Sequence, residues 1–341
     1  MSKTIFPLLC CALFFGCAKP TDPESLYVTG GYTVVGRLSI SGYAEDVKMQ
    51  DTIAYMAQGE GGLSIVSVAD PTRPRLLSLC QQGVRGYAYK LARKDSIVYL
   101  AAGGFGLNTI NVGDPYHPAF VQQFGSASTT YNVEVFGDWV LEAKGEWGLR
   151  FDNLFQVGPG FVDARGRIQG PGYAHGIAVT ADSSMLLTSG EMGVALYDLR
   201  DIGWYGGEGG GWYDERKEYS SWVDLPGYAV DVTTMGTRPI AFVACGTGGV
   251  FVVDFSNRDT LKVIGSYATG GYAKEVAYQN NRLYVTTELR GLQILSVADP
   301  TAPQLVGAIH SSYALGVAVD QHFVYVTDET EGLIIVAIPP Y

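Results

Sequence analysis

The sequence of 341 residues predicts an all-β protein: a seven-bladed β-propeller with four-stranded antiparallel blades, closed by the N-terminal strand. Two motifs that lie in different parts of the repeat return at the same interval. The first is a tyrosine in Gly-Tyr-Ala or a degenerate copy of it, at Tyr43, Tyr87, Tyr131, Tyr173, Tyr228, Tyr272 and Tyr313. The second is a glycine before Leu or Val, at Gly62, Gly106, Gly148, Gly193, Gly249, Gly291 and Gly332. A repeat of about 40–45 residues with four strands is typical of a propeller blade.

Each repeat contains four segments with the pattern of short strands. In the first repeat, residues 42–49 are followed by 53–57, a run rich in β-forming side chains. A glycine-rich turn leads to 63–68, where the residue pattern has the period of two that is expected of a strand. The Asp-Pro-Thr-Arg-Pro turn at 70–74 precedes the fourth strand at 76–80. Proline fixes φ in this turn, and the aspartate side chain bonds to nearby backbone.

The last repeat contains only three strand segments, at 313–319, 323–327 and 333–338. A fourth is found before the first repeat, where Val-Val-Gly-Arg-Leu at 34–38 matches Leu-Val-Gly-Ala-Ile at 305–309. We therefore expect the N-terminal strand to complete the last blade, since a closed ring leaves no exposed sheet edge. This predicts a single ring domain over residues 33–341.

The third strand of the repeat resembles the LVIVD motif that gives a family of bacterial β-propellers its name. It reads Val-Phe-Val-Val-Asp at 250–254 and Leu-Ser-Ile-Val-Ser at 63–67. The Asp-Pro-x-x-Pro turn, which begins at Asp70, Asp114 and Asp299, also fits the family. The third and fourth repeats depart most from the pattern. The resemblance implies a propeller that is secreted or held at the surface as a lipoprotein, and it leaves the biochemical activity open.

The first residues have the pattern of a lipoprotein signal peptide. The apolar run at 5–16 is too short to span a bilayer, which needs about 20 residues. A glycine then stands directly before Cys17, as in a bacterial lipobox, where the cysteine is acylated and becomes the N-terminus. We expect a signal peptide at 1–16 and a tether at 17–32, with the lipid anchored in the cell envelope, at the outer membrane or cell surface. The alternative is simple secretion with cleavage after Ala18.

Composition and motifs exclude several classes of protein. A net charge of −11 without a basic cluster excludes nucleic acid as a partner, because phosphate binding requires Lys and Arg. Cys80 and Cys245 lie beyond the signal peptide and lack the spacing of a zinc site or a disulfide framework. The four histidines stand outside the motifs of metal sites and hydrolases. We therefore expect no metal, no cofactor and no enzymatic activity.

The repeat is broken at one level that should face the central channel. Three residues after the tyrosines stand Asp46, Lys90, Glu134, Gly176, Asp231, Glu275 and Gly316. We expect the charged members to line the channel, where they either bind a cation or basic group, or stay solvated or bond the backbone amides of neighbouring blades. The tyrosines themselves either form a ring at the channel mouth or wedge between blades.

The turns before the third strand carry large apolar side chains in three consecutive repeats: Phe105, Trp147 and Met192. These turns and the tyrosines should lie on the same face of the ring. If they are exposed, they form an apolar patch with Tyr89 and His175, and such patches mark binding surfaces. The alternative is that each side chain packs on its own blade.

An insertion at 201–220 in the fourth repeat accounts for the longest tyrosine spacing. It contains Trp-Tyr twice across a glycine-rich segment: Trp204, Tyr205, Trp212 and Tyr213. Because it follows the third strand, we expect it on the face opposite the tyrosines. The two pairs can stack on sugars, hold a partner protein or cover a blade.

These features together predict an exported lipoprotein that acts as a non-catalytic binding or scaffolding propeller with an unknown protein or glycan partner. One alternative is a surface carbohydrate-binding protein that uses the paired Trp-Tyr residues. The other is a lyase or hydrolase on the channel face, in which His175 acts as a base beside Tyr89 or Lys90.

Overall fold

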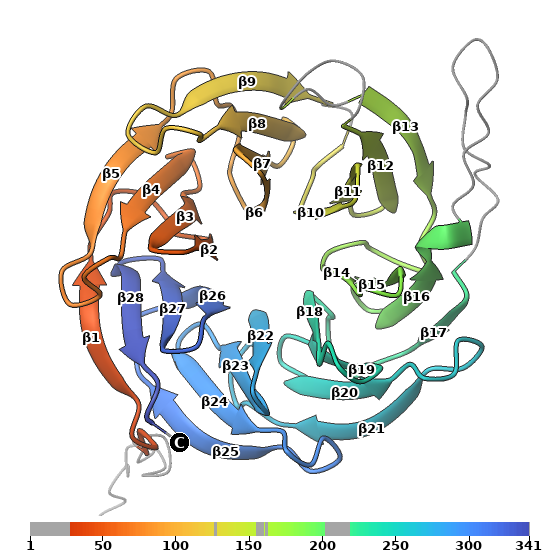
Figure 1. The fold of residues 1–341 in the computed structure, drawn as a ribbon. Coiled ribbons are helices and arrows are strands. Elements are labelled where there is room, and N and C mark those ends of the chain that lie inside the picture. Colours follow the sequence, from red (N-terminus) through yellow and green to blue (C-terminus); the bar gives the residue numbers. More distant parts are fainter. Residues whose placement is uncertain (1–27, 126–127, 155–159, 161–162, 202–218, 341) are drawn as a thin grey trace, which may run out of the picture.

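Seven four-stranded antiparallel sheets surround a central channel and close into one ring (Figure 1). The structure is a computed structural model, and it describes residues 28–125, 128–154, 160, 163–201 and 219–340. Within those residues the regular elements are strands, apart from one 3-10 turn at Leu199–Asp201. The predicted fold class, a seven-bladed propeller with four-stranded blades, is confirmed.

The first strand of each blade lies at the channel and the fourth at the outer rim (Figure 1). Blade 1 consists of β2 (Asp46–Gln50), β3 (Ile53–Ala57), β4 (Leu63–Ser67) and β5 (Arg75–Cys80). Blade 2 consists of β6 (Lys90–Lys94), β7 (Ile97–Ala101), β8 (Leu107–Asn111) and β9 (Ala119–Phe124). Blade 3 consists of β10 (Asn132–Phe136), β11 (Trp139–Ala143), β12 (Leu149–Asn153) and β13 (Asp163–Ile168).

The remaining blades follow in chain order. Blade 4 consists of β14 (Ile177–Val179), β15 (Ser184–Thr188), β16 (Val194–Asp198) and β17 (Ser221–Val223). Blade 5 consists of β18 (Asp231–Thr234), β19 (Ile240–Ala244), β20 (Val250–Asp254) and β21 (Lys262–Tyr267). Blade 6 consists of β22 (Glu275–Gln279), β23 (Arg282–Thr286), β24 (Leu292–Ser296) and β25 (Gln304–Ile309). Blade 7 consists of β26 (Ala314–Val319), β27 (Phe323–Asp328), β28 (Gly332–Ala337) and β1 (Thr33–Leu38).

Blade 7 therefore takes its outer strand from the other end of the chain, and the predicted closure is confirmed. β1 pairs with β28 in antiparallel fashion, with Val34 opposite Val336. Tyr32, just before β1, is buried against the edge of Tyr284 in blade 6, with 6.3 Å between ring centroids. The pairing covers the edge that β28 would otherwise expose to solvent.

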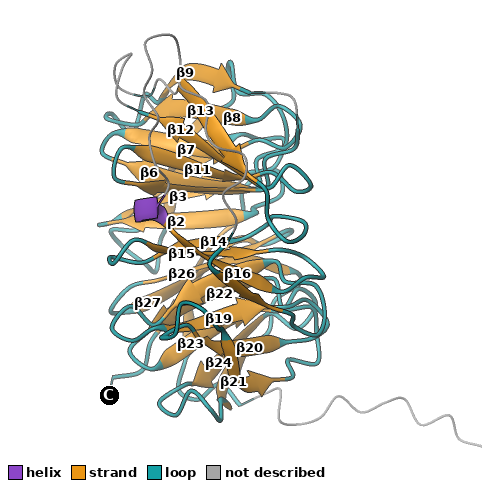
Figure 2. Cartoon of the chain, turned by 90° about the vertical axis from the view of Figure 1, so that its right-hand side faces the viewer, coloured by secondary structure: helices purple, strands orange, loops and turns teal. Residues whose placement is uncertain are grey.

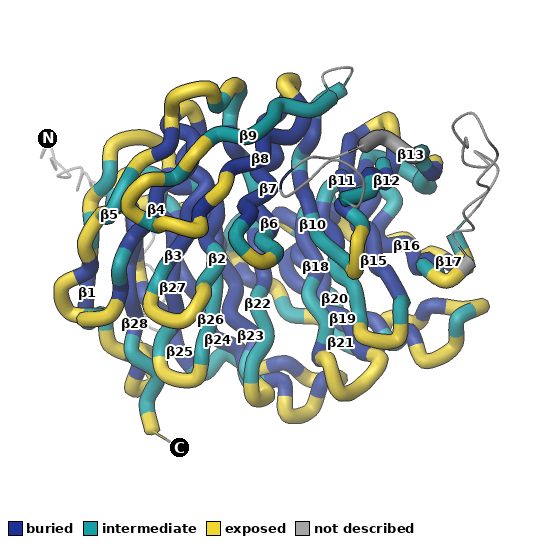
Figure 3. Tube along the Cα trace, turned by 45° about the horizontal axis from the view of Figure 1, so that its top comes forward, coloured by how far each residue is buried: buried dark blue, intermediate teal, exposed yellow. Residues whose placement is uncertain are grey.

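The hydrophobic core lies between neighbouring blades. The second and third strands of the blades are mostly buried, and the turns are exposed (Figure 3). One cluster joins Tyr55 and Ile65 of blade 1 to Leu100 and Ile110 of blade 2, and similar clusters join other neighbours around the ring. Because neighbouring blades cover both faces of each sheet, the inner strands are continuous apolar runs rather than strictly alternating ones.

The two faces of the ring carry different turns (Figure 2). The chain enters each first strand on the same face as the turn from the second to the third strand. We call this the tyrosine face. The turns from the first to the second strand, and from the third to the fourth, lie on the opposite face, which we call the hairpin face. Among the described residues, no helix is long and apolar enough to cross a membrane.

Candidate functional site

Four of the seven repeated tyrosines pack against a glycine of the preceding blade on the tyrosine face, whereas Tyr43 is exposed. Tyr173 lies against Gly145 in the turn of the preceding blade, where an added Cβ atom would stand 2.7 Å from the tyrosine ring. Gly145 has a φ of +58°, which glycine adopts without strain. The same contact joins Gly59 to Tyr87, Gly190 to Tyr228 and Gly246 to Tyr272. A recurring glycine thus leaves room for the tyrosine of the next blade.

Six rings form a continuous arc at the channel mouth, from blade 2 to blade 5: Tyr87, Tyr89, Tyr131, Tyr173, His175 and Tyr228. Neighbouring ring centroids in this arc are 4.7 to 5.8 Å apart. The hydroxyl groups of Tyr131 and Tyr173 are hydrogen-bonded at 2.5 Å. The structure therefore brings Tyr89 and His175 into one cluster, with Tyr131 between them.

Three apolar side chains lie in turns of the same face, next to this arc. Phe105 and Trp147 are 45% and 47% exposed, and Met192 is half-buried. The guanidinium group of Arg167 lies 5.1 Å from the centroid of the Trp147 ring, a cation–π contact. We call the arc together with Phe105, Trp147 and Met192 the aromatic sector.

His175 is enclosed by the rings of Tyr131, Tyr173 and Tyr228. No side chain in the described ranges hydrogen-bonds to its imidazole ring. Burial, together with the positive charge of Lys274, lowers the pKa of His175 to about 4. The imidazole is therefore neutral at physiological pH and has no orienting carboxylate, so its surroundings are those of a packed aromatic ring rather than of a general base.

The opposite side of the mouth carries charged side chains that sequence reasoning missed. Glu45 accepts a hydrogen bond from the Tyr87 hydroxyl group, and Lys274 interacts electrostatically with both Glu45 and His175. Glu45, His175 and Lys274 all stand two residues after a repeated tyrosine. This shared position in the repeat could have indicated from the sequence that the three side chains lie at the same level of the channel mouth. Leu289, in a turn of blade 6, is 72% exposed and was also missed.

One level deeper, charged side chains meet across the channel. Lys90 of blade 2 forms ion pairs with Glu275 of blade 6 and, at 3.6 Å, with Asp46 of blade 1. Asp46 also accepts a hydrogen bond of 2.9 Å from the backbone N–H of Leu91. Asp231 accepts the equivalent bond of 3.0 Å from Val276 N–H in blade 6. Two of the acids thus bond amides of neighbouring blades, as in one of the sequence-based alternatives.

The two glycines at this level are explained by the close approach of blades. A Cβ atom on Gly176 would lie 2.7 Å from the Cα atom of Asp231, and one on Gly316 would lie 2.9 Å from the Cα atom of Asp46. Real Cβ atoms do not approach so closely, because packed interiors leave no such overlap. Each glycine therefore allows an aspartate of the next blade to reach its position.

Burial and mutual repulsion set the protonation of the layer. Burial raises the pKa of Glu275 to about 8, against the attraction of Lys90, and also raises the pKa values of Asp231 and Glu134. Burial acts in the same direction on Asp46, but Lys90, Lys48 and the Leu91 amide outweigh it and lower the pKa of Asp46. The positive charge near these carboxyl groups therefore does not offset the effect of burial on Glu275, Asp231 and Glu134.

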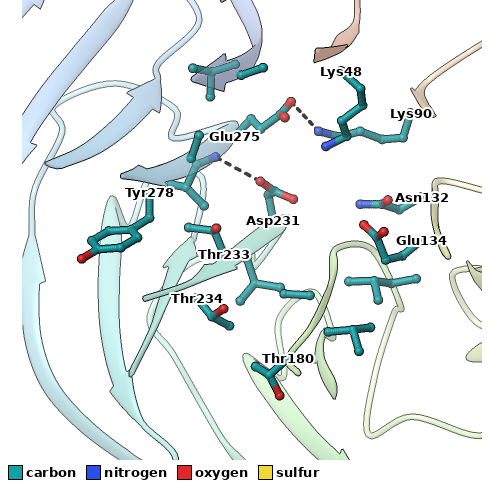
Figure 4. A pocket seen from close by; sticks show the side chains of 18 of the residues that line it. Lys48, Lys90, Asn132, Glu134, Thr180, Asp231, Thr233, Thr234, Glu275 and Tyr278 are labelled. Carbon is teal, nitrogen blue, oxygen red and sulfur yellow. Dashed lines mark hydrogen bonds and ion pairs between the residues drawn. The ribbon is translucent and has the colours of Figure 1, made fainter. Parts of the chain in front are cut away.

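A cavity of about 530 Å³ lies between this layer and the hairpin face (Figure 4). Its charged lining residues are Lys48, Lys90, Glu134, Asp231 and Glu275. Asn132, Thr180, Thr233 and Thr234 add polar groups to the wall, and Phe136 and Tyr278 add aromatic ones. Of the residues expected in the channel, Asp46 lies behind Lys90 and the other four reach the cavity.

Some of the predicted sites lie outside the described residues: Cys17, Trp204, Tyr205, Trp212 and Tyr213. Cys80 and Cys245 are buried, unpaired thiols. Within the described ranges, no group of three or more His, Cys, Asp or Glu side chains is arranged to hold a metal ion.

Comparison with known proteins finds a family model that matches four parts of the chain. A family model described as the LVIVD repeat matches residues 41–81, 226–269, 270–310 and 311–338. These ranges correspond to blades 1, 5, 6 and 7, whereas Phe105, Trp147 and Met192 lie between the matched ranges. No curated protein sequence matches the chain.

Several solved structures have a similar fold. A chain of the mitotic checkpoint complex superposes with a TM-score of 0.70 and 11% identity, over 98% of this chain and 100% of that chain. The WD40 β-propeller domain of Doa1 has a TM-score of 0.67 and 10% identity, over 91% and 98%. The computationally designed Ika8 protein has a TM-score of 0.62 and 9% identity, over 89% and 99%. At such identities the likeness concerns the propeller fold alone.

Proposed function

Because the chain carries LVIVD repeats in a closed seven-bladed propeller, we propose that it is a non-catalytic binding protein of the bacterial cell envelope. In this proposal it is exported, anchored through a lipid on Cys17, and binds a protein partner with its aromatic sector. The observation that carries the proposal is the exposure of Phe105 and Trp147 beside a continuous arc of rings. Clustered aromatic side chains at the centre of a surface supply most of the energy of protein interfaces.

The chemistry of the sector favours a partner with apolar and basic side chains. Glu60, Glu146 and Glu191 are exposed in the turns of blades 1, 3 and 4 on the same face, and the chain has a net charge of −11. These three glutamates attract a basic surface and repel an acidic one, while Arg85 and Arg167 add two positive charges to the same face. The turns are also held by a rigid ring, which limits the entropy lost on binding.

The proposed anchor is compatible with an accessible sector. The apolar run at 5–16 followed by Cys17 supports export and acylation. Val28 lies at the rim of blade 6, where the Ala308 N–H donates to its carbonyl oxygen over 2.8 Å. A tether that begins there leaves blades 2 to 4 unobstructed. Because residues 28–32 pack on the ring, the eleven residues of 17–27 remain as the tether and span at most about 40 Å when extended.

The partner is tested by capture from a membrane-envelope extract of the source bacterium. The bait is the chain from residue 18, as wild type, as F105S/W147S, and as the control Y116S. Tyr116 is 58% exposed in a turn of the hairpin face, so its substitution removes a similar aromatic surface elsewhere. We expect one protein to be captured by wild type and control and lost with the double variant. Equal capture by all three baits would refute the assignment to the aromatic sector.

The anchor is tested separately by metabolic labelling with radioactive palmitate. We expect label in the wild-type chain, membrane association that survives salt washing, and loss of both in Cys17→Ser. Label that persists in Cys17→Ser, or a wild-type chain without label, would exclude the lipid anchor and favour simple secretion.

The enzyme alternative receives no support from the surroundings of His175, which lacks a hydrogen-bonded acid or tyrosine in the described part of the chain. The carbohydrate alternative depends on Trp204, Tyr205, Trp212 and Tyr213, and a glycan panel read by tryptophan fluorescence tests it directly. A fluorescence change abolished by W204F/W212F would replace the protein partner with a sugar.

A further inference from the structure

The cavity at the hairpin end of the channel is separate from the aromatic sector and unexplained by it. Its volume of about 530 Å³ lies within the range of small-molecule sites, about 300–1,000 Å³. Its wall combines five charged side chains with threonine hydroxyl groups (Figure 4). The apolar Val179 and Val317 also line it. A site of this kind selects a ligand through a few placed polar groups.

Lys48 provides a cation that is not neutralised by contact. It stands two residues after Asp46 on β2, so its side chain follows that of Asp46 on the same side of the strand, one step closer to the hairpin face. In the described chain no hydrogen-bond acceptor and no carboxylate within 4 Å is paired with its Nζ atom. The attraction of Asp46, with smaller contributions from Glu275 and Glu134, raises the pKa of Lys48 and keeps it charged.

Glu134 provides the matching anion. Its Oε1 atom accepts a hydrogen bond of 3.1 Å from the N–H of the adjacent Val135, and no cation of the described residues lies within 4 Å of it. Lys90, by contrast, is already paired with both Asp46 and Glu275. Lys48 and Glu134 interact through space without forming an ion pair, and Asp231, which accepts a hydrogen bond from the Val276 amide, adds a second carboxyl group to the wall.

We propose that this cavity binds a small zwitterion of the amino-acid type, with Lys48 bound to its carboxylate and Glu134 to its ammonium group. Lys48 and Glu134 are half-buried; a partly buried ion without a partner is costly, and a ligand that brings the opposite charge compensates it. An inorganic cation would pair Glu134 and leave Lys48 unpaired, and an anion would do the reverse. A molecule with both charges pairs both side chains at once.

The rest of the wall fits such a ligand. Asn132 and Thr233 line the cavity and supply further donors and acceptors, and Asp231 lies close enough to raise the pKa of Glu134. A bound ammonium group would relieve that repulsion, because an opposite charge favours the ionised carboxylate. Val179 and Val317 offer a surface for a small apolar side chain.

The test uses isothermal titration calorimetry of the chain from residue 18 with three matched probes. L-leucine carries both charges, 3-methylbutan-1-amine lacks the carboxylate, and 4-methylpentanoate lacks the amine. We expect L-leucine to bind with a Kd below about 1 mM and each singly charged probe to bind at least about tenfold more weakly. Equal binding of the three probes, or no binding of L-leucine, glycine or L-lysine at about 10 mM, would overturn the proposal.

Variants locate the site on the same protein. Lys48→Met and Glu134→Gln should each weaken L-leucine binding by about tenfold or more, whereas Lys262→Met, an exposed lysine on β21, should bind as wild type. Circular dichroism and thermal unfolding verify that the variants are folded. Undiminished binding in both channel variants would also overturn the proposal. Capture of the protein partner depends on the tyrosine face, whereas amino-acid binding depends on the cavity near the hairpin face. Failure of one experiment therefore does not predict failure of the other.

Discussion

Lys90 of blade 2 forms an ion pair with Glu275 of blade 6, three blades away around the ring (Figure 4). The same ammonium group lies 3.6 Å from Asp46 of blade 1. The pair therefore connects opposite walls of the channel just below the tyrosine face. One lysine balances much of the negative charge that several blades place at this level.

Replacing Lys90 with methionine should destabilise the ring. The change keeps most of the length of the side chain but leaves Asp46 and Glu275 buried without their cation, and breaking a buried pair in this way costs about 3–5 kcal/mol. The free energy of unfolding in urea measures the effect. Lys94→Met is the control, because Lys94 pairs with the exposed Asp138 on the surface and should lose less than about 1 kcal/mol. Similar losses in both variants would contradict a special role of the channel pair.

The stability should fall as the pH rises from 6.5 to 8, and Glu275 should account for part of the fall. Burial raises the pKa of this carboxyl group to about 8 from an ordinary 4.5. The unfolded chain therefore binds fewer protons than the folded one in this window, and folding loses stability with rising pH, by at most about 1.4 kcal/mol per pH unit for one group. Urea unfolding of Glu275→Gln at both pH values should give a smaller fall than wild type. The exposed Glu60→Gln is the control, and an unchanged slope in Glu275→Gln would refute the assignment.

His175 should have the opposite effect on the pH dependence of stability, and at lower pH. Burial lowers its pKa to about 4 from an ordinary 6.5, so the folded chain binds fewer protons than the unfolded one between these values. The stabilisation that this histidine supplies is complete above pH 6.5 and is lost as the pH falls towards 4. His175→Phe keeps an aromatic ring among the tyrosines and should gain about 1–2 kcal/mol relative to wild type on going from pH 7 to pH 5. Thermal unfolding at the two pH values measures this gain, and parallel changes in both proteins would show that His175 is not buried in the neutral form.

Because Gly145 contacts Tyr173, replacing Gly145 with alanine should destabilise the fold through a steric clash. A second glycine with a similar φ but no close neighbour separates this clash from the cost of backbone strain. Gly145→Ala places a methyl group 2.7 Å from the ring at a φ of +58° and should cost about 2–4 kcal/mol. Gly137 has nearly the same φ, +57°, with no atom within 4 Å of an added Cβ, so Gly137→Ala should cost only about 1 kcal/mol. Chemical unfolding of the two variants measures the difference. Equal costs would mean that Tyr173 moves aside freely.

The architecture could be predicted because it depends on local patterns that recur. A tyrosine and a glycine-Leu/Val step, each repeated seven times, mark the same points in every blade, and the match of 34–38 with 305–309 indicates the closing strand. The same reasoning placed Phe105, Trp147 and Met192 in equivalent turns, because turns of one type lie on one face of a propeller. Their exposure, and the stacking of Arg167 on Trp147, required the structure.

The charged residues of the channel were predicted less completely from the sequence. Asp46, Lys90, Glu134, Asp231 and Glu275 share one register, but the register that contains Lys48 lies two residues further along β2 and has no counterpart charge in most repeats. The charged side of the mouth was missed for a similar reason, since Glu45 and Lys274 belong to a register two residues after the tyrosines. A repeat motif identifies positions where the same residue type recurs. These charged side chains occupy positions where the residue type differs from repeat to repeat, so the motif does not identify them.

The sequence by itself determined the number of blades, the order of their strands and the strand that closes the ring, because spacing and alternation are properties of neighbouring residues along the chain. Only the tertiary structure decided which charges meet. Lys90 and Glu275 are 185 residues apart, and their contact depends on the diameter of the channel and on the reach of both side chains. The same holds for Lys48 and Glu134, which face one cavity without touching, because closure of the ring places their strands around a common axis.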